Sequence, residues 1–260
     1  MTGVQTCALP ICSLIIAILL VAWETFARSG AVTMFMLPPL SLVLERIWSD
    51  ALGGDLWLNI GVTLYRAIAG FLIAAVAGVV LGMAMSRSKI MSWFFDPIIS
   101  VGFPMPKIAF LPIIILWLGL YDVSKIAMIV FDAIFPVVTA TIVGIQGVEK
   151  ELIWSARNMG AKDREMMWQI VLPAALPQIL TGLQVALPIA LIVAVVCEMA
   201  MGGYGLGGAM MTSSRFADSR GVFAGIVEIA LVGYVIVKGM SVLRRRLLIW
   251  HQEANEPTTA

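Results

Sequence analysis

The chain has 260 residues, of which 60% are hydrophobic and only 13% are charged, and its formal net charge is +1. A soluble domain of ordinary composition has about 25% charged residues, so this composition predicts an integral membrane protein. The mean hydropathy of +0.97 points the same way. The near-neutral charge favours no nucleic-acid partner. The cysteines and the histidine have spacings that predict neither a disulfide framework nor a metal site: Cys7, Cys12, Cys197 and His251.

The first eleven residues of the chain are MTGVQTCALPI, and the DNA that would encode them is informative. A start codon followed by the bases of a DNA that resembles a common short-read sequencing adapter translates into this peptide. The base left over fits the codon of Cys12. The alternative is a genuine short tail. We interpret residues 1–11 as a non-native, adapter-derived segment and exclude them from the prediction of the fold.

The sequence predicts an all-α membrane protein with about six transmembrane helices. The first is expected at residues 13–26, and residues 12–36 comprise this helix and an outer loop. It is shorter than the roughly 20 residues that a crossing needs, and a truncated start explains the difference. A cleaved signal peptide is the alternative, but no small-residue cleavage site follows. Residues 37–56 carry an apolar stripe among polar residues, which favours a helix at the membrane interface.

Residues 57–246 are predicted to form a core of five helices. The glycines Gly70, Gly78 and Gly82 have the small-residue spacing that lets membrane helices approach closely. A run with four prolines predicts a broken entry before a continuous helix. The five spans are expected at about residues 60–85, 90–120, 123–145, 174–197 and 222–243.

The longest charged interruption of the apolar sequence lies at residues 149–178. Such a segment cannot lie in hydrocarbon, so it is a loop in water. Apolar residues recur at helical spacing from Leu152 to Met159, and Gly160 suits the left-handed turn that ends a helix. A second helix is expected to begin near Asp163. This helix–turn–helix is typical of a surface that docks another protein.

The same loop resembles the cytoplasmic "EAA" loop of bacterial ABC-importer permeases, whose pattern is Glu-Ala-Ala, three residues, Gly, nine residues, Ile-x-Leu-Pro. Here Gly160 is followed by nine residues and then by Ile-Val-Leu-Pro, and Ser155 and Ala156 occupy the two small positions. The pair Ala156-Arg157, followed by Gly160-Ala161, is similar to the nitrate/sulfonate/taurine subfamily. By this resemblance, residues 148–172 form the loop that couples to an ATPase, and the candidate contacts are Glu151, Trp154, Ser155, Ala156, Arg157, Gly160, Ala161, Leu172 and Pro173.

One position departs from the family pattern. Trp154 stands where the family has glutamate, and Glu151 lies one turn earlier. Which of the two takes over the role of that glutamate stays open. Other segments support the resemblance, which covers the chain from residue 37 to residue 250. These are Thr63, Arg66 and Gly70 in one span, Pro106, Ala109, Pro112, Trp117 and Gly119 in the next, and Glu198 with Gly205-Leu206-Gly207.

Several charged residues lie within or at the edge of apolar spans. A charge at the centre of a bilayer costs roughly 2.5–3.5 kcal/mol, so such residues usually face protein or water. They are candidates for a translocation path, but structural pairs, such as Lys107 with Asp132, and interfacial positions are equally open. Residues 202–208 have neither the preceding strand nor the Gly-Lys-Ser/Thr of a phosphate loop, which favours a turn or gate. The candidate path or gate residues are Lys107, Asp132, Glu198, Gly205 and Gly207.

Positive charges favour one orientation in the inner membrane. If the coupling loop is cytoplasmic, both termini are cytoplasmic as well, and residues 247–260 form a cytoplasmic tail. The inside then carries the larger positive set: Arg87, Lys89, Lys150, Arg157, Lys162, Arg164 and Arg244 to Arg246. The outside carries Arg28, Arg46, Lys125, Arg215 and Arg220.

The resemblance implies a permease of the type I importer fold that is not itself an enzyme and binds no cofactor, because ATP is bound by a separate subunit. It also implies a homodimer in the lipid bilayer, a cytoplasmic ATPase dimer, an extracytoplasmic solute-binding protein, and a small anion such as a sulfonate or nitrate as solute. A secondary transporter or channel without an ATPase is the alternative, but it would predict internal repeats. A membrane scaffold would leave the spacing of the loop unexplained.

Overall fold

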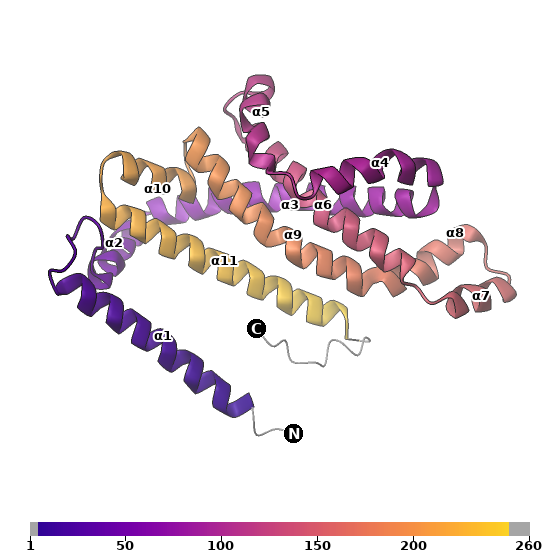
Figure 1. Cartoon of the computed structure of the whole chain (residues 1–260), viewed down its shortest axis with the longest axis horizontal. Helices are drawn as coiled ribbons and strands as arrows, with labels where there is room; N and C mark the ends of the chain where they lie inside the picture. The colour runs from indigo at the N-terminus through magenta and orange to yellow at the C-terminus, as the bar shows by residue number, and fades with distance from the viewer. Residues whose placement is uncertain (1–4, 250–260) are drawn as a thin grey trace.

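The computed structural model describes residues 5–249, and side chains from residue 14 onward. Within this part of the chain every regular element is a helix (Figure 1). In chain order they are α1 (Gln5–Arg28), α2 (Leu40–Gly53), α3 (Asp55–Arg87), α4 (Lys89–Gly102), η1 (Lys107–Phe110), α5 (Leu111–Leu118), α6 (Asp122–Gln146), α7 (Lys150–Asn158), α8 (Asp163–Met166), η2 (Met167–Val171), α9 (Leu172–Met201), α10 (Leu206–Arg215) and α11 (Ser219–Leu247).

The core is a bundle of α3, α6 and α9, with α11 packed against α9 (Figure 1). The predicted glycine spacing is confirmed as a close helix contact. A Cβ on Gly70 would lie 2.5 Å from the Ile129 side chain, and one on Gly78 would lie 2.8 Å from Val137. Since both partners are buried residues of α6, the glycines let the two backbones approach closely.

The proline-rich segment was predicted to have a broken entry followed by a continuous helix, and the structure differs from this. It forms α4, a short 3₁₀ turn and α5, and the two halves are bent by 99°. Pro104 and Pro106 lie in the break, where they have no amide hydrogen to donate to a helix. Pro97 is tolerated inside α4, and Pro112 occupies the first turn of α5. The prolines therefore break the span in its middle rather than only at its entry.

Among the described residues, four helices are long and apolar enough to cross a membrane, and the bent pair raises the number to five. They are α3, α6, the α9 region and α11, so the predicted five-helix core agrees with this range. The expected first span, α1, is not among them. About six spans were predicted, and the total therefore stands at four or five without α1.

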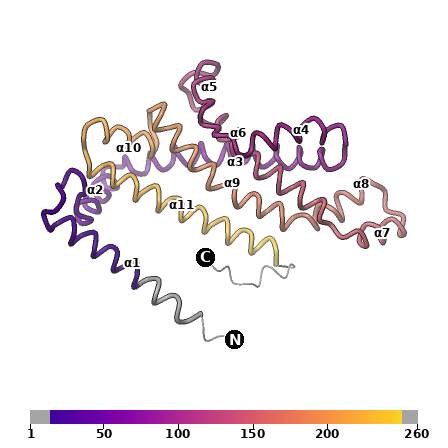
Figure 2. The backbone as a smooth tube through the Cα atoms, viewed as in Figure 1, coloured from indigo at the N-terminus to yellow at the C-terminus, as the bar shows by residue number. Residues whose placement is uncertain are grey.

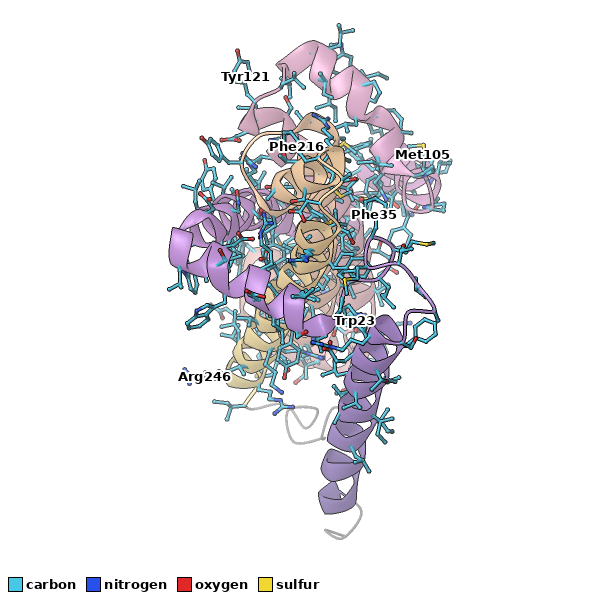
Figure 3. All side chains as sticks on the ribbon, turned by 90° about the vertical axis from the view of Figure 1, so that its left-hand side faces the viewer. Trp23, Phe35, Met105, Tyr121, Phe216 and Arg246 are labelled. Carbon is cyan, nitrogen blue, oxygen red and sulfur yellow. The ribbon has the colours of Figure 1, made fainter. Side chains whose placement is uncertain are left out.

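Helix α1 stands apart from the bundle (Figure 2). The C-terminal part of α1 contacts the rest of the chain through Trp23, whose indole N–H donates a hydrogen bond to the Pro38 carbonyl at 3.1 Å. The Trp23 ring also lies 5.9 Å from the ring of Phe223 in α11. Figure 3 shows Trp23 at this junction and the rest of α1 extending beyond it. The backbone of residues 5–11 continues this helix, while residues 1–4 lie outside the described part.

The two ends of the bundle differ in their elements (Figure 1). One end carries α2, α10 and the turn that joins α9 to α10. The other carries α7 and α8, the region predicted to be the coupling loop. Helix α2 falls within the expected interfacial segment, and Arg244, Arg245 and Arg246 form the last turn of α11, as predicted. The tail from residue 250 lies outside the described residues.

Candidate functional site: the coupling loop and a buried polar cluster

The coupling loop, residues 148–172, forms the predicted helix, glycine turn and second helix. Helix α7 ends at Asn158, and Gly160 has a φ of +85°, which confirms the predicted left-handed turn. The Ala161 N–H donates to the Ala156 carbonyl at 3.0 Å, and the Gly160 N–H donates to the Arg157 carbonyl at 2.9 Å. This pair of bonds is the Schellman arrangement that satisfies the free carbonyls at a helix end.

A small apolar core holds α7 against the base of α9. It includes Val148, Met166 and Val171, and Ile153 of α7 packs against it. Ala156 was predicted to contact the partner, but it is only 2% exposed. Helix α7 contacts α8 and η2, and the Ala156 methyl group is covered by the chain itself. Enlarging Ala156 would therefore disturb the loop before it disturbed a partner.

The opposite face of α7 is open to solvent. Trp154 is 58% exposed, and Glu151 and Arg157 are exposed as well. Because Glu151 and Trp154 lie three positions apart, they share one side of the helix. A groove of about 710 Å³ runs between α7 and the start of α9 and is lined by Leu152, Ser155, Met159, Ile170 and Pro173, among others. The loop thus offers a firm backbone with exposed apolar side chains.

The second half of the loop runs into the bundle without a break. The Lys162 N–H donates to the Glu165 carboxylate at 3.0 Å, which caps the start of α8. A single π-helical turn, η2, joins α8 to α9. Pro173 follows it, and because proline has no amide hydrogen the ordinary i to i−4 bond to Gln169 cannot form. Leu172 is half-buried and Pro173 is exposed.

A buried polar cluster lies at the α2–α10 end, about the side chains of Thr63, Arg66 and Glu198. Arg66 Nη1 lies 2.7 Å from Glu198 Oε1, and Arg66 Nη2 lies 2.6 Å from Asp122 Oδ1. Thr63 Oγ1 donates to Glu198 at 2.8 Å. Glu198 is 0% exposed and Arg66 5%. These charge-assisted hydrogen bonds to a buried carboxylate connect α3 to α9.

The cluster also shapes the glycine turn, residues 202–208. The Arg66 guanidinium donates to the Tyr204 carbonyl at 2.6 Å, and the Gly207 N–H donates to Glu198 at 3.1 Å. A Cβ on Gly205 would overlap the Glu198 carboxyl group, and Gly205 also has a φ of +126°. Glycine is therefore required where the turn crosses the carboxylate.

Three of the candidate path residues belong to this cluster. Glu198, Gly205 and Gly207 are brought together by the structure, but the carboxylate is enclosed by its own chain. Their partners Thr63, Arg66 and Asp122 were not predicted as path residues. A signal was present, because Thr63 and Arg66 belong to the span motif that was matched to the subfamily. Their spacing of three positions places them on one side of α3, facing α9.

The other two candidates form a pair elsewhere. Lys107 Nζ lies 3.0 Å from Asp132 Oδ1, which is the structural pair that the sequence left open. Lys107 is 8% exposed, donates to the Phe103 carbonyl at 3.1 Å, and lies 4.7 Å from the centre of the Phe135 ring. The ammonium group thus joins the break between α4 and η1 to α6.

The apolar helices and the water-facing helix–turn–helix define the class of a membrane transport subunit. A family model described as "Binding-protein-dependent transport system inner membrane component" matches residues 70–249. The chain belongs to this family. It is therefore the inner-membrane permease subunit of a binding-protein-dependent ABC importer, works with an ATPase and a binding protein, and is not an enzyme.

Individual relatives agree with this assignment. The chain is 32% identical to the taurine transport system permease protein of Escherichia coli (strain K12), covering 92% of this chain and 88% of the relative. It is 35% identical to a putative aliphatic sulfonates transport permease protein of Bacillus subtilis (strain 168), covering 90% and 85%.

A solved structure has the same fold. A chain of an amino acid ABC transporter solved with histidines has a TM-score of 0.62 and 18% identity, over 79% of this chain and 96% of that chain. At this level of identity the likeness concerns the fold alone. It supports the type I importer permease architecture.

Proposed function

We propose that two copies of the chain form one translocation path for a small organic sulfonate, with taurine as the first compound to test. The relatives named for taurine and for aliphatic sulfonates support this solute class, since each covers nine-tenths of the chain. The second copy is what the resemblance to type I importer permeases implies, and the family match is consistent with it.

The coupling loop is the element through which a cytoplasmic ATPase dimer drives this path. The observation that carries this proposal is the Schellman turn at Gly160, which holds α7 rigidly while its outer face remains exposed. Trp154 offers an apolar contact and Glu151 a carboxylate on that face. Closure of the ATPases would push on α7, and the unbroken run from α8 into α9 would carry the movement into the bundle.

In this arrangement the α7–α8 end is cytoplasmic, and so are both termini of the chain. The α2–α10 end faces the extracytoplasmic binding protein, which delivers the solute. The positive charges of Arg87, Lys150 and Arg244 then lie on the cytoplasmic side. At the outer end, the glycine turn packs over the bundle through contacts of Gly205 and Gly207 with Glu198. In a gate, these three residues would keep the turn closed.

Uptake by the variant Gly160→Val tests this proposal. A left-handed conformation costs a non-glycine residue roughly 1–2 kcal/mol, and the branched side chain would project from the docking face. We expect the variant to insert and dimerise, but to lose ATP-dependent taurine uptake in proteoliposomes with the cognate ATPase and binding protein. Association with the ATPase should weaken in parallel.

Gly30→Val is the matched control. Gly30 also has a positive φ, +77°, with nothing within 4 Å of an added Cβ, but it lies in the loop after α1. It should retain wild-type uptake at equal protein level. Wild-type uptake by Gly160→Val would show that this loop is not the coupling element. Uptake without ATP would favour the alternative of a secondary transporter or channel.

A further inference from the structure

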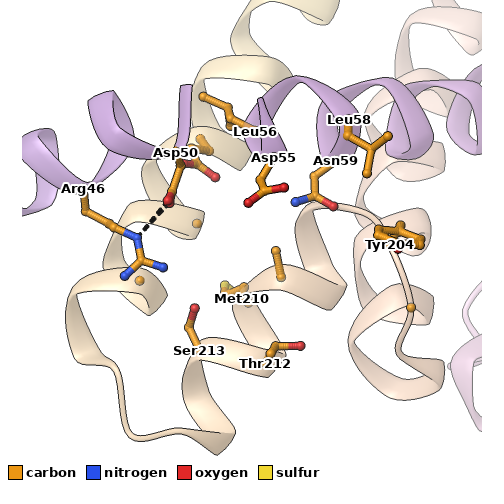
Figure 4. Close-up of a pocket in the computed structure, with 15 residues that line it drawn as sticks. Arg46, Asp50, Asp55, Leu56, Leu58, Asn59, Tyr204, Met210, Thr212 and Ser213 are labelled. Atoms are coloured by element: carbon orange, nitrogen blue, oxygen red, sulfur yellow. Dashed lines mark hydrogen bonds and ion pairs between the residues drawn. The ribbon is translucent and has the colours of Figure 1, made fainter. Parts of the chain in front are cut away.

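A cavity of about 500 Å³ lies at the α2–α10 end, beside the buried polar cluster (Figure 4). It is enclosed by α2, the first turns of α3, the glycine turn, α10 and α11. Its volume falls within the range of about 300–1,000 Å³ that is usual for small-molecule sites. Figure 4 shows Asp55, Asn59, Thr212 and Ser213 gathered about its interior.

The cavity has an excess of negative charge. Asp50, Asp55 and Glu228 line it, against Arg46 as its basic residue. Arg46 is already matched, because it donates to Asp50 at 2.9 Å and to Asp218 at 2.6 Å. Desolvation would raise the pKa of Asp218, but the Gly221 N–H and Arg46 outweigh it and hold that pKa below its ordinary value. Two carboxylates, Asp55 and Glu228, thus remain for a ligand.

Glu228 is the unusual member of this set. Its side chain is more than nine-tenths buried, and within the described residues its Oε1 atom has no hydrogen-bond partner. It lies about 14 Å along α11 from Ser219, at 1.5 Å per residue. Buried polar atoms are nearly always hydrogen-bonded, so an unpartnered carboxylate oxygen that lines a cavity indicates a missing donor.

A ligand that carries a hydrogen-bond donor would satisfy this oxygen, and a positively charged donor would also suit the acidic lining. A primary ammonium group is a compact charge with three donors. The carbon atoms beside it would contact the apolar part of the lining, which includes Leu56, Leu58 and Met210.

We propose that this cavity binds a small organic solute by its primary ammonium group, which Glu228 and Asp55 hold. The inference rests on the proposed function and deepens it, since it selects amine-bearing sulfonates such as taurine over plain alkanesulfonates. The cavity then lies where a solute released by the binding protein first enters the permease. The amine is recognised before the solute reaches the path between the two copies.

Equilibrium binding of radiolabelled taurine to the purified full-length permease in nanodiscs tests the site. We expect unlabelled taurine and ethanolamine to compete, and ethanesulfonate, which has no amine, not to compete. Glu228→Gln should weaken binding about tenfold or more, because it removes a charge-assisted hydrogen bond. Asp55→Asn, at an exposed position, should weaken taurine binding about threefold. This variant tests the site if Glu228→Gln does not fold. Glu45→Gln, at an exposed carboxylate of α2, is the control and should bind as wild type.

Equal competition by ethanesulfonate, or wild-type binding by both Glu228→Gln and Asp55→Asn, would overturn the site. Such a result, together with ATP-driven sulfonate uptake, would leave the proposed function intact. Amine-dependent binding without any sulfonate uptake would instead overturn the proposed solute and retain the cavity as an ammonium site. Competition by sodium or magnesium chloride at matched ionic strength would reassign it to an inorganic cation and contradict the inference.

Discussion

The two ends of the bundle each contain a glycine with a positive φ, but the surroundings of the two glycines differ. In the coupling loop, Gly160 makes a left-handed turn in open space, with nothing within 4 Å of an added Cβ. In the buried polar cluster, Gly205 makes a positive-φ turn directly against the Glu198 carboxyl group. The first glycine ends α7 with a left-handed turn that is open to solvent. The second lets the chain close over a charge.

The difference extends to the charged residues. Arg157 and Asp163 of the coupling loop are 4.0 Å apart with exposed side chains, and such surface pairs contribute at most about 1 kcal/mol. Arg66 and Glu198 are buried, so each is costly without the other. The charged pair of the buried polar cluster is therefore part of the packed fold, whereas the charged pair of the coupling loop is exposed to solvent.

The largest expected effect comes from breaking the buried pair. Glu198→Ala leaves the Arg66 guanidinium without its buried partner and should lower the free energy of unfolding by about 3–5 kcal/mol. Glu151→Ala, at an exposed carboxylate of the coupling loop, should change it by less than about 0.5 kcal/mol. Denaturant titration of the purified variants in detergent measures both. Similar losses in the two variants would remove the contrast between the ends.

A smaller effect on stability is expected when each of the two glycines is replaced by alanine. Gly160→Ala adds only backbone strain, roughly 1–2 kcal/mol. Gly205→Ala adds the same kind of strain and also displaces the Glu198 carboxyl group, so its melting temperature should fall further. Thermal unfolding of both variants measures the difference. If Gly160→Ala were the less stable of the two, the assignment of open and crowded turns would be wrong.

Much of the fold could be predicted because it follows from local sequence. Apolar runs predicted most of the spans, glycines at close spacing predicted a close helix contact of α3, and Gly160 predicted the turn of the coupling loop. That α6 is the partner of α3 was not predicted. The bend in the proline-rich segment could not be predicted. Prolines show that a helix is interrupted, but whether the halves stay aligned depends on contacts such as Lys107 with Asp132 of α6.

The site was only partly predictable for a similar reason. The exposed face of α7 follows from helical periodicity, but the burial of Ala156 depends on how α7 packs against α8 and η2. Glu198 stood out as a charge in an apolar span, yet its partners Thr63 and Arg66 lie more than 130 positions away in sequence. A single sequence does not reveal which distant charges meet.

Cysteine labelling at position 154 tests the central claim most directly. In a background without Cys7 and Cys12, a maleimide reagent should label Trp154→Cys only from the cytoplasmic face of membrane vesicles, and bound ATPase should protect it. Ser214→Cys, at an exposed position of α10, should be labelled only from the opposite face and be indifferent to the ATPase. Labelling of Trp154→Cys from the outside, or at an unchanged rate with the ATPase bound, would contradict the account.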